Sequence, residues 1–130
     1  MSIIGAAACY FAIVFGAGFI AGTIRTLLLA PVMNEGLAVL IELPIMIAIS
    51  WWACGFVLRR MKPVPDLPAR IAVGTIAFAL MLAAEVMVSL GLAGLTFRQH
   101  LALYAALPAQ LGLVGQLFFA AFPLIRRNTP

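Results

Sequence analysis

Charged residues are scarce in this sequence. Asp, Glu, Lys and Arg make up 9% of its 130 residues, whereas soluble domains carry about a quarter. Eight basic and four acidic side chains cannot cover the water-facing surface of a domain of this size. The shortage excludes a soluble globular protein, and also a disordered chain, which needs high charge and low hydrophobicity. The basic residues are too few and too scattered for a nucleic-acid-binding surface, so we expect no nucleic-acid partner.

Histidine and cysteine are also rare. The chain has one histidine, His100, and two cysteines, Cys9 and Cys54. A di-metal carboxylate bundle needs Glu-x-x-His pairs and a zinc hydrolase needs H-E-x-x-H, and the sequence contains neither. We therefore predict no metal and no cofactor, and nothing in these patterns indicates an enzyme. Haem or pigment binding through His100 stays open, and the cysteines are interpreted as small buried hydrophobic residues.

Apolar side chains, by contrast, are abundant. They make up 65% of the residues, and the mean hydropathy is +1.18. Four long apolar runs, at residues 3–29, 37–58, 71–92 and 101–125, come near the ~20 residues that a helix needs to cross a membrane. Short connections force neighbouring helices to be antiparallel. We predict an all-α membrane protein, with one transmembrane domain over residues 1–130 that forms a four-transmembrane-helix antiparallel bundle.

Lys and Arg are unevenly divided between the two ends of this predicted bundle. The end with both termini and the middle connection has Arg59, Arg60, Lys62, Arg70, Arg126 and Arg127. The opposite end has Arg25 and Arg98. Because basic loops stay in the cytoplasm, we predict cytoplasmic termini and a multi-pass protein of the bacterial inner membrane. The first run lacks a basic start and a cleavage site, so we interpret it as a retained helix.

Three ionisable residues fall inside the predicted spans. Arg25, Glu42 and Glu85 lie on three different runs, and the rise of a helix places all of them roughly 6 to 11 Å from the outer boundary. Glu35 lies one heptad before Glu42, on the same face and nearer the interface. A charge inside a membrane costs several kcal/mol unless it is paired or hydrated. These residues are therefore candidate ligand-binding residues.

Glycines and prolines lie on the same helices as these charges. Gly18 and Gly22 form a G-x-x-x-G pair on the stripe that carries Arg25, so we predict helix packing there and an inward-pointing Arg25. Pro44 and Pro108 are expected to interrupt the second and fourth helices.

Further polar residues reach the depth of the charges. Ser89 lies one turn from Glu85 on the same helix face, and Tyr104 and Gln110 come to a similar depth from the last run. Gln116 lies near the middle of that run. We predict an outward-facing polar pocket whose ligand-binding residues include Ser89, Tyr104 and Gln110 beside the charges.

Two carboxyl groups against one guanidinium suggest a binding site. Arg25 can hold one carboxylate while the other takes up a proton or a small cationic solute, and we predict that the pocket binds or transports such a species. A purely structural interpretation also stands, in which Arg25 and Glu42 fix the packing and Glu85 is protonated and hydrogen-bonded to a neighbour. The alternative function is a non-catalytic accessory subunit of a larger membrane complex. The expected partners are the lipid bilayer and either further copies of the chain or other subunits.

One stretch carries a resemblance. Its residues are Gly22-Thr23-Ile24-Arg25, Pro31, Glu35-Gly36, Glu42-x-Pro44 and Met46. In these positions the chain resembles small bacterial integral membrane proteins that carry no assigned function. The resemblance covers little more than the first half of the chain. It implies a four-helix inner-membrane protein and adds no substrate, cofactor or reaction.

Overall fold

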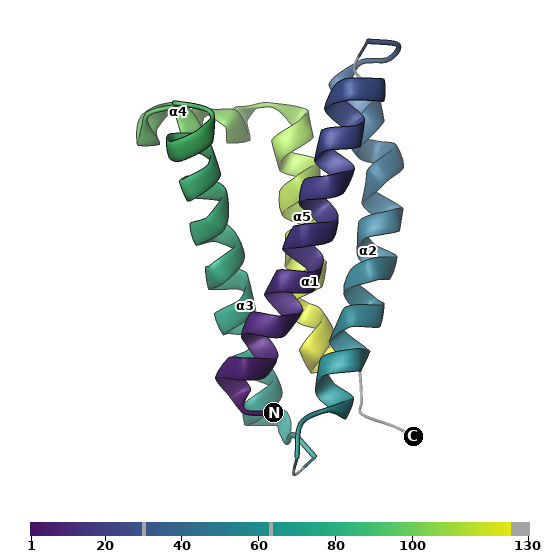
Figure 1. Ribbon diagram of the computed structural model, residues 1–130, viewed down its shortest axis with the longest axis vertical. Helices are drawn as coiled ribbons and strands as arrows, with labels where there is room; N and C mark the ends of the chain where they lie inside the picture. Colours follow the sequence, from purple (N-terminus) through teal and green to yellow (C-terminus); the bar gives the residue numbers. More distant parts are fainter. Residues whose placement is uncertain (30, 63, 126–130) are drawn as a thin grey trace.

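The computed structural model is built from helices (Figure 1). It describes residues 1–29, 31–62 and 64–125, and within these ranges it contains no β-strand. In chain order the elements are α1 (Ile3–Ile24), the π-helical turn η1 (Arg25–Leu29), α2 (Glu35–Arg59), α3 (Leu67–Met87), the π-helical turn η2 (Val88–Leu92), α4 (Phe97–Ala102), the 3-10 turn η3 (Leu103–Ala105) and α5 (Leu107–Ile125). The side chain of Glu35, and the whole of Arg126 and Arg127, lie outside the described part.

Four helical segments are long and apolar enough to cross a membrane. They are Ile3–Leu29, Gly36–Arg59, Leu67–Leu92 and Leu107–Ile125. This confirms the multi-pass, all-helical character predicted from the apolar runs. Polar side chains mark where the helices begin, because they accept backbone N–H groups that lack a partner in the first turn. Asn34 accepts from the backbone of Leu37 at 2.7 Å, and Asp66 accepts from that of Ala69 at 3.0 Å.

The structure divides the apolar run at residues 101–125 into the end of α4, η3 and α5, with the break just before Pro108, where an interruption was expected. The short helix α4 begins at a capping box made by Thr96 and Gln99, and the chain then turns through η3 into the extended residue Ala106. Pro108 is the reason for the break, because its ring would clash with the carbonyl of Tyr104 in a continuous helix. Within the first turn of α5, the missing N–H of proline costs nothing.

Pro44 behaves differently from Pro108. It lies inside α2, which runs without a break from Glu35 to Arg59. The expected interruption of the second span is therefore wrong. Membrane-spanning helices tolerate an internal proline where neighbouring groups satisfy the freed backbone.

The long helices form a ring. α1 contacts α2 and α3, and α5 contacts the same two helices. In Figure 1 the start of α1, the end of α2 and the start of α3 lie at the lower end of the molecule, which we call the core end. α4 lies across the upper end, which we call the α4 end, and α3 diverges from α1 and α2 towards it.

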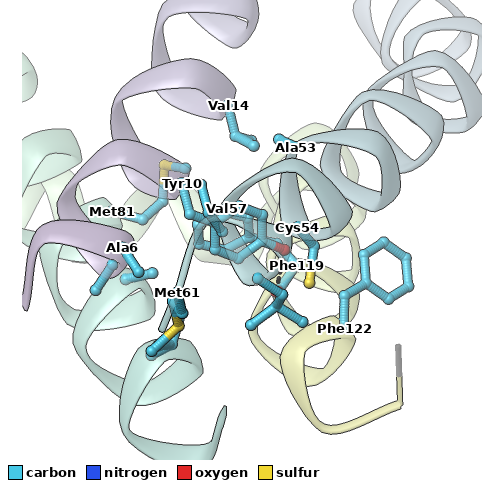
Figure 2. Close-up of a cluster of buried hydrophobic side chains, with 14 residues drawn as sticks. Ala6, Tyr10, Val14, Ala53, Cys54, Val57, Met61, Met81, Phe119 and Phe122 are labelled. Atoms are coloured by element: carbon cyan, nitrogen blue, oxygen red, sulfur yellow. Dashed lines mark hydrogen bonds between the residues drawn. The ribbon is translucent and has the colours of Figure 1, made fainter. Parts of the chain in front are cut away.

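The hydrophobic core lies at the core end (Figure 2). The ring of Tyr10 on α1 stacks on that of Phe119 on α5, with centroids 4.2 Å apart, and its hydroxyl donates to the Phe119 carbonyl. α3 and α5 also touch closely, because a Cβ at Gly74 would clash with the carbonyl oxygen of Ala120. The helices are therefore held together at the core end and leave space towards the α4 end.

Candidate functional site

A cavity of about 730 Å³ lies between the helices on the α4 side of the core. Its wall takes residues from α1, η1, α2, α3, η2, α4, η3 and α5. Its volume falls in the range of small-molecule sites and greatly exceeds that of a bare ion. Most of the wall is apolar. The ionisable side chains on it are Arg25, Glu42, Glu85, His100 and Tyr104.

Arg25 and Glu42 form an ion pair at the edge of this cavity. The Nη1 atom of Arg25 donates to Oε2 of Glu42, and the two side chains are 24% and 16% exposed. Arg25 is the first residue of η1, where α1 loosens into a π-helical turn, a feature common at functional sites. Arg25 was expected to hold one of two carboxylates, and in the structure it holds that of Glu42.

Glu85 has a different set of partners. Its Oε1 accepts from Nε2 of Gln116 on α5, and its Oε2 accepts from the Tyr104 hydroxyl at 3.3 Å. Burial first, and then the adjacent Glu85 carboxyl, raise the pKa of Tyr104. The phenol therefore keeps its proton and can donate to Glu85. Both of these donors are neutral, so neither balances a negative charge on this carboxyl.

His100 fixes α4 over this site. It is 5% exposed, and its Nδ1 lies 2.7 Å from the Ser89 hydroxyl on η2. Its ring also meets that of Tyr104 edge-on, with centroids 5.7 Å apart. His100 therefore joins α4 to η2 and supports the phenol that reaches Glu85. Among the described residues, no three His, Cys, Asp or Glu side chains gather closely enough to hold a metal ion.

Not every predicted site residue lines the cavity. Arg25, Glu42, Glu85, Ser89 and Tyr104 all do. Gln110 is exposed and outside the lining, and its amide donates to the backbone carbonyl of Tyr104 at 3.1 Å. For Glu35, the described part of the chain includes the backbone alone.

Gly18 and Gly22 also border the cavity. A Cβ on Gly18 would lie 3.5 Å from the end of Met46, and one on Gly22 would lie 3.6 Å from the Arg25 guanidinium. Both are ordinary contact distances. Near these positions, the lack of a side chain leaves space beside Arg25.

Gln116 is the site residue that the sequence reasoning missed. Its place near the middle of an apolar helix was a usable signal, because an amide buried in a membrane needs partners. Its Nε2 donates a hydrogen bond to Oε1 of Glu85. Its Oε1 is buried and accepts no hydrogen bond from the described residues.

Comparisons with protein-family models, with curated proteins and with solved structures found no match to this chain. The geometry of the cavity is therefore what carries the functional argument.

Proposed function

We propose that this is a small multi-pass membrane protein whose cavity binds a proton or a small cationic solute at Glu85. One observation carries the proposal: Glu85 lies on a largely apolar cavity and has neutral donors, while the Arg25 guanidinium pairs with Glu42. We therefore assign the pairing with Arg25 to Glu42 and the binding of the positive species to Glu85.

The charge balance of the cavity supports this division. Arg25 and Glu42 together add no net charge. A carboxylate whose hydrogen-bond donors are neutral is still costly in a largely apolar site, so it takes up a proton or pairs with a cation. Glu85 is then the group whose state changes when a positive species enters.

The orientation of the protein is part of the proposal. The end of α2 lies at the core end (Figure 1). Arg59 is the last residue of α2, and it is exposed, as are Arg60 and Lys62 directly after it. Basic residues favour the cytoplasmic side. We place the core end and both termini in the cytoplasm of a bacterial inner membrane, with the spans antiparallel. The cavity then lies in the outer half of the bilayer. The exposed apolar side chains outside the cavity lining, such as Ile20, Ile24 and Leu117, would contact lipid or further copies of the chain.

Glu85→Gln tests the function, because it removes the carboxyl and keeps the shape. The purified protein in nanodiscs is titrated calorimetrically with 2-phenylethylammonium and with its N,N,N-trimethyl analogue, against protein-free nanodiscs. Infrared spectroscopy follows protonation of the carboxyl. We expect Glu85→Gln to lose cation binding and the titrating carboxyl band, while Thr75→Val, at an exposed position of the same helix, keeps both.

Two results would count against this function. Wild-type protein that binds neither cation and shows no titrating band from Glu85 would refute it. A Glu85→Gln protein that is altered in stability or in assembly with other subunits alone would favour the accessory-subunit alternative.

A further inference from the structure

We infer that the ligand of this cavity is an organic amine in its ammonium form, with N–H donors and an apolar body. The inference rests on the proposed function and names the class of cation that the site takes. It follows from the hydrogen-bonding capacity that Glu85 and Gln116 leave open, and from the size and lining of the space beside them.

The polar group around Glu85 has more acceptors than donors. Each carboxylate oxygen can accept about two hydrogen bonds, and each oxygen of Glu85 receives one from the described residues. The Oε1 atom of Gln116 is buried and receives none from them. A buried acceptor without a donor costs about 1–3 kcal/mol. A ligand with more than one N–H can bond to both Glu85 and Gln116, which a quaternary ammonium ion cannot do.

The rest of the cavity suits an apolar body. Phe15, Phe19, Met46, Met81 and Phe119 are among the side chains on its wall. Aromatic faces attract cations, and thioethers adapt to ligands of irregular shape. At about 730 Å³, the space is too large for an inorganic cation that lacks its water shell. Among the described residues of the wall, Glu85 is the one carboxyl outside the ion pair, and it matches one positive charge on a larger, mostly apolar molecule.

The two probes named above separate this inference from the proposed function. They share an aromatic body and one positive charge, and they differ in that the trimethyl analogue has no N–H group. Wild-type protein in nanodiscs is expected to bind 2-phenylethylammonium about tenfold or more tightly than the analogue, as hydrogen bonds to charged groups predict. This comparison needs no variant and so does not depend on how a variant folds.

Gln116→Leu locates the selectivity. We expect the preference for 2-phenylethylammonium to fall about threefold or more in this variant, because Leu offers the ammonium no acceptor while the Glu85 carboxylate still accepts one of its N–H groups. Leu117→Ala is the control, since Leu117 is the next residue of α5 and is 56% exposed; it should keep the wild-type preference.

The outcomes distinguish the two claims. Equal binding of both probes by the wild type overturns the amine inference and leaves cation binding at Glu85 standing. A preference that Gln116→Leu leaves unchanged overturns the part of the inference that has the ammonium donate to Gln116. A titrating Glu85 with no binding of either probe also overturns the inference and leaves a proton as the ligand. Wild-type protein that shows no titrating Glu85 and binds neither probe would refute the proposed function itself.

Discussion

At the scale of single residues, the site depends on which carboxyl Arg25 holds. The structure pairs Arg25 with Glu42 and gives Glu85 neutral donors. Glu42 is therefore expected to contribute to stability, while Glu85 is expected to contribute to binding. Substituting each with Gln removes the same charge, so the two variants form a matched pair.

The contribution of the ion pair can be measured with a double-mutant cycle. Glu42→Gln and Arg25→Gln should each destabilise the protein, because each leaves its partner partly buried without an opposite charge. The double variant should cost less than the sum of the two, with a coupling energy of about 1.5–3 kcal/mol. The measurement is equilibrium unfolding of the four proteins in one detergent. Additive costs would show that the pair does not stabilise the fold.

At the scale of helices, the contact between α3 and α5 decides where the bundle closes. Gly74→Ala is expected to destabilise the protein by about 1–3 kcal/mol, because the new Cβ would meet the backbone carbonyl of Ala120, which cannot rotate away. Gly16→Ala is the control, since a Cβ there has no neighbour within 4 Å. That change should be neutral or stabilise α1 by up to about 1 kcal/mol. Unfolding of both variants in the same detergent checks the contrast, and equal effects would contradict it.

The same scale shows why the sequence predicts some helices better than others. The first three spans follow from apolar composition. α2 begins at Glu35, before the predicted residue 37, because Asn34 caps it. α3 begins at Leu67, before the predicted residue 71, because Asp66 caps it.

The sequence also predicts an interruption at Pro108, which the structure has, and another at Pro44, where α2 is continuous. The two prolines are chemically identical but have different effects on their helices. The difference lies in whether the neighbouring residues can form a separate structure on the N-terminal side of the proline. Thr96 offers a capping box for a separate helix α4 just before Pro108.

The candidate site was predictable in part for a related reason. Charges inside apolar runs stand out in a sequence, so Arg25, Glu42 and Glu85 could be selected by depth alone. Their partners depend on which helix faces meet, and this is decided by packing at the core end. Gln116 meets Glu85 because α5 lies against α3, and spacing along one helix carries no information about that contact.

At the scale of the whole molecule, orientation relative to the membrane decides what can reach the cavity. The core end carries Arg59, Arg60 and Lys62 beside a well-packed interior, whereas the cavity lies towards the α4 end. If the basic end is cytoplasmic, a solute reaches Glu85 from the outer side and the core separates it from the cytoplasm. The opposite orientation would expose the same site to cytoplasmic solutes.

Reporter fusions in a bacterial host test this orientation. A green fluorescent protein fused at the C-terminus should fluoresce and alkaline phosphatase fused there should be inactive, because fluorescence requires the cytoplasm and phosphatase activity requires the outer side. The same reporters fused after Gly94, which turns the chain between η2 and α4 at φ 71°, should give the reverse pattern. Replacing Arg59, Arg60 and Lys62 with Gln should weaken the contrast, since those charges set the bias. Equal signals from both reporters at one position would mean that the chain inserts in both directions, and Glu85 would then face each compartment in half of the molecules.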